Sequence, residues 1–413
     1  MKLSLSSQNV IQYLQEAGLS SSEDGATADA DLPHSSNPKD INILVTLASN
    51  RKLLVKQELA QEFNGIPHEF FNEWLFHQLL ESFPVLGNIK ALSTLLVHYD
   101  EDNSILVRDY LEEYQGLQSY YRNNLYFPPE LANCIGSTLA ALHRATFKRQ
   151  KYRDFMATAP AGQIRYQYFN PAQGIDFLEP SIFGKVSSAG LSFYSHYQSH
   201  DFLESAIADL ASAFDPCCLT HNDLKLENVL VHSRNFNLDN PEVKIIDWEA
   251  CAWGDPAYDL GTLLASYLNI WLESLVVDST LDLEESLELA AIPLEILQPS
   301  MLALTESYLK AFPMILEYRK DFIGSIIKFA GLALINRIQD KINNQQNLHH
   351  TSLITLEFAK NILTRTPEYV IDIFGKSELQ ILKPFVKSAK VPVNERENNL
   401  IPLFYEKTRL RGC

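Results

Sequence analysis

The chain has 413 residues, 46% hydrophobic and 21% charged, which is the balance of a globular protein with roughly two or three lobes. Its net charge of −17 disfavours nucleic acid and anionic membranes as partners, and it serves either solubility or attraction of a cationic substrate or basic partner. Five cysteines without a CxxC pair indicate neither a zinc site nor a disulfide framework, and the first residues lack an apolar signal core, so we expect a cytoplasmic protein.

The N-terminal part of the sequence predicts a small, mostly antiparallel unit with one prominent helix. Runs of apolar residues indicate the strands, and apolar residues spaced by three and four indicate the helix. A turn at Asn50-Arg51 joins the first two strands into a hairpin. In chain order we expect a helix at 8–18, a polar loop at 19–40, strands at 41–47 and 53–57, a helix at 68–83, and strands at 92–99 and 104–110.

From residue 111 the sequence is largely helical. The apolar stretch 260–277 is interrupted by polar residues, so it predicts a buried helix rather than a membrane span. The last segment, 378–413, mixes proline with charge and predicts a tail. Between residues 111 and 378 we expect helices at 128–144 and 202–214, an irregular segment at 151–185, a strand-loop-strand unit at 219–247, and several helices at 257–373.

The residues that can carry chemistry gather between 219 and 261. His221, Asp223 and Asn228 have the spacing H-x-D-x-x-x-x-N, and Asp247 follows an apolar strand. A carboxylate in a loop, such as Asp223, can accept the proton of an attacking hydroxyl, and the oxygens of Asn228 and Asp247 suit Mg²⁺. This set meets the needs of phosphoryl transfer, which depends on positioning and on charge neutralisation.

Three blocks in order resemble the aminoglycoside phosphotransferase and choline kinase family. They are the loop HNDLKLEN at 221–228, the element Asp247-Trp248-Glu249, and the stretch GDPAYDL at 254–260. The helix IGSTLAALH at 135–143 also resembles a helix of this family. Trp248 stands where protein kinases carry Phe-Gly, so the resemblance is to the small-molecule branch. It covers about residues 40–345 and is strongest at 219–261.

The resemblance implies an α+β, bilobal protein-kinase-like fold that transfers the γ-phosphate of ATP to a hydroxyl, with Mg²⁺ as cofactor. We expect a small antiparallel β N-lobe with one main helix at 1–110, a larger, mostly helical C-lobe with the acceptor site at 111–377, and a tail at 378–413. The roles that it implies are Asp223 as base, Lys225 beside the γ-phosphate, Asn228 and Asp247 as metal ligands, and His221 and Asp259 as supports of the loops.

On the nucleotide side, Lys56 in the second hairpin strand resembles the lysine that grips the α- and β-phosphates of ATP. Glu73 in the following helix is its expected ion-pair partner. Glu69, one turn earlier, is the alternative to Glu73, and Lys52 is the alternative to Lys56.

The phosphate loop departs from the glycine-rich pattern, because no such loop precedes residue 41. Ser36-Asn37 stands there instead and matches a Ser-Asn pair that the family often carries. Small polar residues present backbone N–H groups to phosphate, though less freely than glycine does. We expect the adenine to lie against the connection that includes Arg108 and Tyr110, where backbone groups would read its edge.

Three functions stay open at the level of sequence. In the first, the acceptor is a small alcohol, as on a cationic molecule such as an aminoglycoside or choline. In the second, it is Ser or Thr of a peptide from a natural-product pathway, with which Lys225 is compatible. In the third, the chain is a degenerate nucleotide-binding scaffold that acts through a protein partner; the absent glycine loop favours it, and the intact Asp223, Asn228 and Asp247 argue against it.

Overall fold

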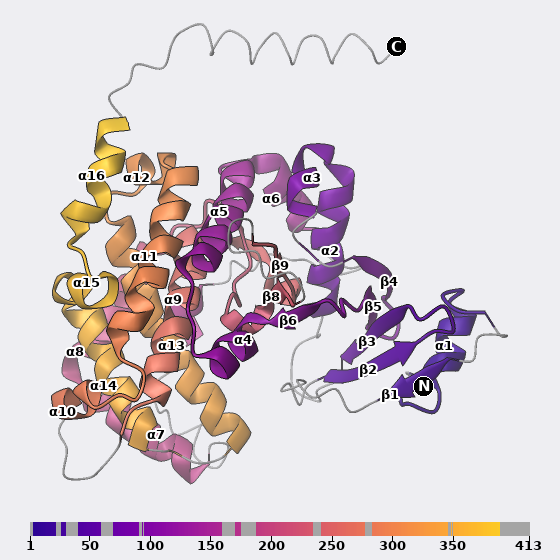
Figure 1. Ribbon diagram of the computed structural model, residues 1–413, viewed down its shortest axis with the longest axis horizontal. Helices are drawn as coiled ribbons and strands as arrows, with labels where there is room; N and C mark the ends of the chain where they lie inside the picture. Colours follow the sequence, from indigo (N-terminus) through magenta and orange to yellow (C-terminus); the bar gives the residue numbers. More distant parts are fainter. Residues whose placement is uncertain are drawn as a thin grey trace, which may run out of the picture.

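Apolar runs near the N-terminus form a five-stranded antiparallel sheet, which lies on the right of the computed structural model in Figure 1. The structure describes residues 3–21, 26–29, 40–58, 69–90, 93, 95–158, 170–174, 187–233, 241–276, 283–345, 348 and 350–388. The predicted hairpin and the two later strands are confirmed with small shifts of their ends. The strands, in the spatial order β1-β2-β3-β5-β4, are β1 Thr27–Asp29, β2 Asp40–Thr46, β3 Lys52–Glu58, β5 Ile105–Asp109 and β4 Leu96–Asp100.

The edge strand β1 lies where the sequence predicted only a polar loop. Ala28 of β1 pairs with Val45 of β2 and packs against the apolar residues on that face of the sheet. A strand of three residues is too short to show an alternating pattern, so the sequence gives no sign of it.

The two faces of the sheet have different chemistry. Val55 and Val107 lie opposite each other on the face that packs against helix α1, Val10–Glu16. Lys56 and Arg108, one residue further on in each strand, therefore lie on the other face. The apolar face and α1 form the outer cluster, whose buried members are Leu5, Val10, Tyr13, Leu14, Ile43, Val45, Leu47, Leu53, Val55, Ile105 and Val107.

Helix α2, Glu69–Ser82, confirms the helix predicted at 68–83 and joins the sheet to the helical lobe. Its apolar side chains belong to the large core that runs through the helical lobe. Phe76 stacks on Trp248 with ring centroids 4.0 Å apart, and Asn72 Nδ2 donates to the carbonyl of Glu249 at 2.8 Å. One helix thus carries Glu73 on the sheet side while being fastened to the loop that contains Asp247. The short helices η1, Pro84–Leu86, and α3, Gly87–Lys90, follow it.

The larger lobe is built from helices packed side by side, on the left of Figure 1. Its main contacts join α5 to α11, α9 to α13 and α13 to α14. Its helices are α4 Leu117–Asn124, α5 Pro129–Thr146, α6 Gln150–Met156, η2 Pro171–Gly174, α7 Ser188–Gln198, α8 Asp201–Ala213, α9 Pro256–Glu273, α10 Leu283–Glu288, α11 Leu294–Ala311, α12 Met314–Tyr318, α13 Phe322–Gln345, α14 His350–Thr364, α15 Thr366–Phe374 and α16 Glu378–Ser388.

Two small sheets hold the loops that carry the predicted chemistry. One contains three antiparallel strands in the order β6-β8-β9, namely Tyr114–Gly116, Val229–His232 and Val243–Ile245. The other pairs β7, Cys218–Thr220, with β10, Ala252–Gly254. The single-turn helices η4, Leu226–Asn228, and η5, Trp248–Ala250, lie in the connections. The predicted strand-loop-strand unit is therefore confirmed, and each loop is bounded by strands of a sheet.

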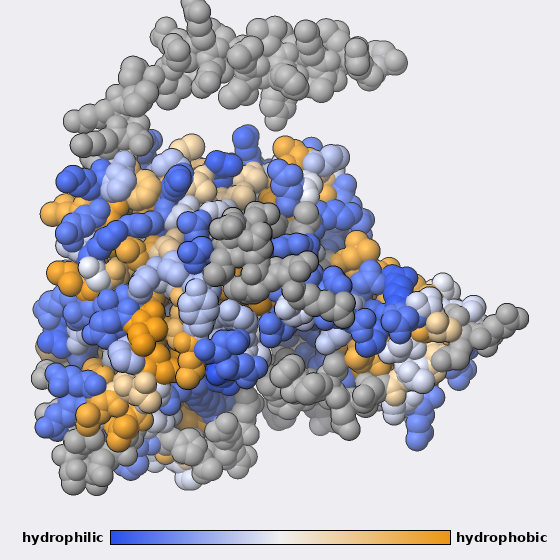
Figure 2. Space-filling view, viewed as in Figure 1, coloured by the Kyte–Doolittle hydropathy of each residue, from blue (hydrophilic) through white to orange (hydrophobic). Residues whose placement is uncertain are grey.

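Two apolar helices form the centre of the larger lobe. The helix predicted within 260–277 is confirmed as α9, and nearly all its residues are buried. Among the described helices, the segment Phe322–Ile342 of α13 is long and apolar enough to cross a membrane, and 67% of its most apolar window is buried inside the protein. On the surface seen in Figure 2, hydrophilic residues predominate and apolar ones gather in patches.

The predicted tail begins as a helix. Residues 378–388 form α16, whose Ile381 is buried in the large core, while the rest of the segment 378–413 lies outside the described residues. The boundary predicted at residue 110 stays a prediction. It follows the end of β5, but α2, which precedes it in the chain, shares its core with the helical lobe.

Candidate active site

One buried carboxylate fixes the backbone of the loop between β7 and η4. Asp259, in the first turn of α9, accepts hydrogen bonds from the backbone N–H groups of His221 and Asn222, each at 2.8 Å. Its Oδ2 also lies 3.1 Å from Nε2 of His143 on α5. Asn222 has a φ of 64°, a left-handed conformation that asparagine tolerates better than most residues. Two core helices thus hold this loop in one conformation.

His221 connects this loop to the strand that precedes Asp247. Its Nε2 lies 2.8 Å from the carbonyl oxygen of Ile246, and its Nδ1 accepts from the backbone N–H of Asp223 at 3.3 Å. Together these bonds assign the neutral tautomer with its proton on Nε2. His221 therefore orients the backbone on both sides of the site and donates its only proton to a carbonyl.

Asp223 is held by its neighbours but remains accessible, with 41% of its side chain exposed. Its Oδ2 accepts from Lys225 Nζ at 2.8 Å and from Asn228 Nδ2 at 3.1 Å. Asn228 Nδ2 also donates to the carbonyl of Asp223 at 2.8 Å, so the amide oxygen of Asn228 faces away from that loop. Burial lowers the pKa of Lys225, but the adjacent Asp223 raises it above its ordinary value, so the lysine is charged.

Asp247 lies two residues after the end of β9 and has a left-handed conformation with a φ of 60°. Its Oδ1 is 3.1 Å from Lys56 Nζ and 3.0 Å from Arg108 Nη2. Burial raises the pKa of Asp247, but the charges of Lys56 and Arg108 lower it well below its usual range. The carboxylate is therefore ionised and carries two cations on one oxygen.

The expected ion pair between Lys56 and Glu73 is not formed. Lys56 pairs instead with Asp247 and, at 3.7 Å, with Glu249, while Glu73 Oε1 lies 3.6 Å from Arg108 Nη1. Among the described residues, neither carboxylate oxygen of Glu73 accepts a hydrogen bond. The reason is that Arg108 lies on the same face of the sheet as Lys56, so its guanidinium stands between α2 and Asp247.

The alternatives for this pair lie elsewhere. Lys52 pairs with Glu112, and the backbone N–H of Glu69 donates to Glu58 Oε1 at 2.9 Å where α2 begins. Neither residue joins the five charged groups that meet at the junction of the two lobes. We call those five the charge cluster: Lys56, Glu73, Arg108, Asp247 and Glu249.

Glu249 is a member of the charge cluster to which the sequence alone assigned no role. Burial raises its pKa to about 8. Burial also raises the pKa of Glu73. The place of Glu249 in the element Asp247-Trp248-Glu249, two residues after the expected metal ligand Asp247, was the signal that could have found it.

Arg108 and Tyr110, expected at the connection near the adenine, lie at the end of β5 and directly after it. The side chain of Arg108 is buried in the charge cluster rather than exposed at the connection. Tyr110 is exposed, and its backbone N–H donates to the carbonyl of Lys52 at 2.9 Å, so that group is used within the sheet. Ser36 and Asn37 lie outside the described residues. The side chain of Arg108 thus belongs to the charge cluster, and the adenine and phosphate-loop assignments both stay predictions.

The oxygens of Asn228 and Asp247 are chemically suited to a magnesium ion. The backbone N–H of Ile246, next to Asp247, donates to the carbonyl of Asn228 at 3.0 Å, so the two loops adjoin. Mg²⁺ typically binds one or two carboxylates and keeps several waters beside substrate phosphates. In the described part of the chain, three or more His, Cys, Asp or Glu side chains nowhere gather as a metal site. This donor set fits Mg²⁺ rather than zinc.

Tyr258 of α9 lies near three carboxylates, one of which is Asp223. Burial raises the pKa of Tyr258, and the nearby charges of Asp223, Asp259 and Asp340 raise it further. Asp340 is exposed on α13, three residues after Arg337, which pairs with Glu227 of η4 at 2.8 Å. The charges of Asp223 and Asp340 therefore both act on the space around Tyr258.

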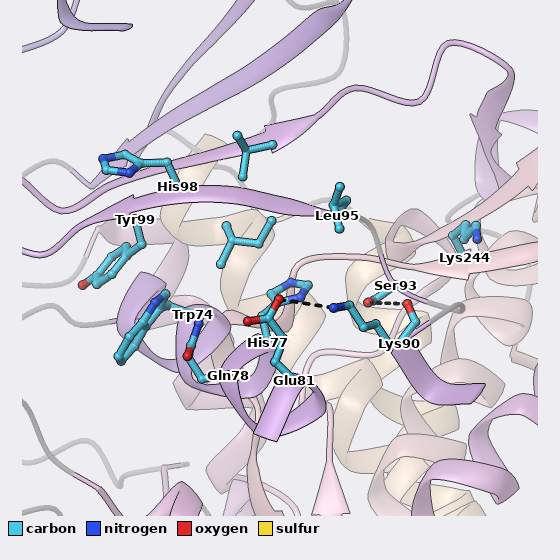
Figure 3. Close-up of a pocket in the computed structure, with 12 residues that line it drawn as sticks. Trp74, His77, Gln78, Glu81, Lys90, Ser93, Leu95, His98, Tyr99 and Lys244 are labelled. Carbon is cyan, nitrogen blue, oxygen red and sulfur yellow. Dashed lines mark hydrogen bonds and ion pairs between the residues drawn. The ribbon is translucent and has the colours of Figure 1, made fainter. Parts of the chain in front are cut away.

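A separate cavity of about 470 Å³ lies between α2 and β4, shown in Figure 3. Trp74 of α2 stacks on Tyr99 of β4 with centroids 5.7 Å apart, and Lys90 pairs with Glu81 at 3.2 Å. His77, one turn after Glu73, also lines it. The lining contains none of the predicted site residues, so this cavity is distinct from the site at Asp223 and Asp247.

Both the sequence and the fold of the chain resemble those of known phosphotransferases. A model of the phosphotransferase enzyme family (APH) matches residues 77–285, slightly more than half of the chain. The structure is similar to a choline/ethanolamine kinase family protein from Mesorhizobium loti, with 14% identity over 88% of this chain and 97% of that chain and a TM-score of 0.48. It is similar to choline kinase LicA from Streptococcus pneumoniae (17%, 87% and 99%, TM-score 0.42) and to APH(2")-IIa in complex with gentamicin (13%, 90% and 99%, TM-score 0.43). No curated protein sequence matches the chain.

Proposed function

Since the chain belongs to the phosphotransferase enzyme family and is an ATP-dependent phosphotransferase acting on hydroxyl groups, we propose that its acceptor is a small molecule that carries a cationic group. The observation that supports this most is the position of Asp223. It is accessible, it is held by Asn228 and Lys225, and it acts together with the carboxylates of Asp259 and Asp340 on the neighbouring Tyr258.

In the proposed reaction, Asp223 accepts the proton of the acceptor hydroxyl while the oxygen of that hydroxyl bonds to the γ-phosphorus. The bond between the γ-phosphorus and the departing ADP breaks in the same step. Lys225 stands beside Asp223 and neutralises charge on the transferred group. Lys56 holds the phosphates of ATP from the sheet side. Asn228 and Asp247 would hold Mg²⁺, which neutralises phosphate charge when bound. His221 and Asp259 keep the two loops in register through their backbone bonds.

A screen for acceptor-dependent ADP release tests the proposal. Cationic amino alcohols should stimulate release, while uncharged alcohols of the same size should stimulate it less. Stimulation by Ser/Thr peptides alone would indicate that the acceptor is a peptide. If no class of acceptor stimulated ADP release, a nucleotide-binding scaffold would be the function that remains.

The contribution of Asp340 to acceptor binding has its own test. Asp340→Asn should raise the KM for a cationic acceptor about two- to fivefold and leave the KM for an uncharged one unchanged, because it removes one exposed charge. Asp372→Asn, on the exposed surface of α15, is the control. Equal changes for both acceptors would show that Asp340 does not read charge.

A further inference from the structure

Arg108 is the one group in the charge cluster that contacts both Glu73 and Asp247. Its Nη2 lies 3.0 Å from Asp247 Oδ1, and its Nη1 lies 3.6 Å from Glu73 Oε1. The residue is 6% exposed, and among the described residues Nη1 makes no hydrogen bond. A guanidinium is planar and forked, so a single side chain can bridge carboxylates from α2 and from the loop after β9.

This bridge lies at the carboxylate that a metal would use. Lys56 and Arg108 both contact Oδ1 of Asp247, and one carboxylate oxygen has two lone pairs. A divalent ion bound at Asp247 would therefore lie next to two fixed cations in a poorly hydrated place. Like charges at such distances repel strongly where water does not screen them. The nucleotide phosphates, in contrast, bring negative charge that offsets both cations.

We propose that Arg108 is a positioning residue that holds Glu73 and Asp247 in place before nucleotide binds and makes the divalent metal enter with the nucleotide rather than before it. The inference rests on the proposed metal site at Asp247 and Asn228, and it is independent of the identity of the acceptor. Without Arg108, Glu73 would be a buried carboxylate with no cation in contact, and Asp247 would keep only Lys56 of the two cations that contact it.

Binding of Mn²⁺, followed by electron paramagnetic resonance on the full chain without acceptor, tests this directly. Mn²⁺ prefers the same oxygen ligands as Mg²⁺ and reports binding without turnover. The informative variant is Arg108→Met with Glu73→Gln, which removes the guanidinium together with the carboxyl group that it contacts. We expect its affinity for free Mn²⁺ to rise about tenfold over that of the wild type. With a non-hydrolysable ATP analogue present, the gain should shrink to about threefold or less.

Three single variants complete the design. Glu73→Gln should weaken free Mn²⁺ binding about threefold, because Arg108 then pairs with Asp247 alone. Arg108→Lys keeps a cation but cannot bridge both carboxylates, so it should tighten Mn²⁺ binding even if the double variant does not fold. Asp247→Asn should abolish Mn²⁺ binding, which would show that the measurement reports the site at Asp247.

The results separate the two proposals. An Mn²⁺ affinity unchanged in both Arg108→Lys and the double variant would overturn the role of Arg108, whatever acceptor is found. A gain that persists in full with the ATP analogue would overturn the binding order. If the predicted changes appear but no alcohol is phosphorylated, the role of Arg108 stands and the proposed acceptor class fails.

Discussion

Asp223 differs from the other carboxylates of the site in its exposure. Its side chain is 41% exposed, whereas that of Glu73 is 1% exposed and that of Asp247 is 24% exposed and covered by two cations. A group that must receive a proton from a bound acceptor needs such access. Asp223→Ala should therefore lower kcat at least about a hundredfold while leaving the affinity for ATP close to that of the wild type.

Steady-state kinetics and calorimetry with Mg²⁺ and ATP measure the two halves of this prediction. Asp209→Ala, on the exposed side of α8, is the control for the loss of a surface carboxylate. A variant that kept wild-type kcat would remove Asp223 from the role of base. One that lost ATP affinity as well would place it on the nucleotide.

His77 gives the protein a measurable dependence on pH. Burial lowers the pKa of this histidine, which lines the cavity beside α2, to about 4. Between pH 6.5 and 4 the unfolded chain therefore binds a proton that the folded protein does not. The contribution to stability is present above pH 6.5 and is lost as the pH falls towards 4, by about 3 kcal/mol at most.

Urea unfolding at several pH values measures this contribution. His77→Gln should flatten the pH dependence of the free energy of unfolding between pH 4 and 6.5, whereas His196→Gln, exposed on α7, should leave it unchanged. Equal slopes in His77→Gln and the wild type would mean that His77 titrates normally.

The contact between α5 and α11 depends on a glycine. A Cβ added to Gly136 would lie 2.2 Å from the carbonyl oxygen of Leu304, and a helix backbone cannot yield as a flexible side chain does. Gly136→Ala should therefore lower the free energy of unfolding by about 3 kcal/mol. Gly324 in α13 has no atom within 4 Å of an added Cβ, so Gly324→Ala should instead stabilise the protein by about 0.5–1 kcal/mol.

Chemical denaturation of the two variants compares these effects. Opposite signs are expected, because both changes add one methyl group to a helix and differ only in the space around it. Destabilisation by both would indicate a general intolerance of α-helical glycine replacement here, and would contradict the argument from close packing.

The elements that the sequence predicts well are those whose signal is local. Strands β2 and β3, helix α2 and the spacing from His221 to Asn228 depend on residues close together in the chain. The partner of Glu73 was predicted wrongly because it depends on which face of β5 meets α2. Arg108 lies opposite Leu54, and only this register places its side chain beside Lys56. Strand β1 was not predicted because three residues are too few to show a periodic pattern.

At the scale of the whole molecule, α2 is the helix that connects the sheet to the loop after β9. Phe76 on Trp248 and Asn72 on the carbonyl of Glu249 fix it to the helical lobe, while Glu73 meets Arg108 of the sheet. The charge cluster therefore lies where both lobes contribute. A change in the angle between lobes would change the distances among these five groups before it changed either core.

The sheet has a core of its own, so its stability can be altered separately. Leu14 of α1 is fully buried in the outer cluster, among Val55 and Val107 on the face opposite Lys56. Leu14→Ala would leave a cavity there and should cost about 2–5 kcal/mol. We expect hydrogen exchange to quicken in β2, β3 and β5 and to stay unchanged in α9 and α13, which belong to the large core.

The same variant should weaken ATP binding, because β3 carries Lys56 and its backbone is held against α1 by this cluster. Gln12→Ala, exposed on the same helix, is the matched control and should change neither exchange nor affinity. Faster exchange in both lobes would mean that the outer cluster and the large core unfold as one unit. Unchanged exchange everywhere would mean that α1 does not stabilise the sheet, and Lys56 would then be positioned by the charge cluster alone.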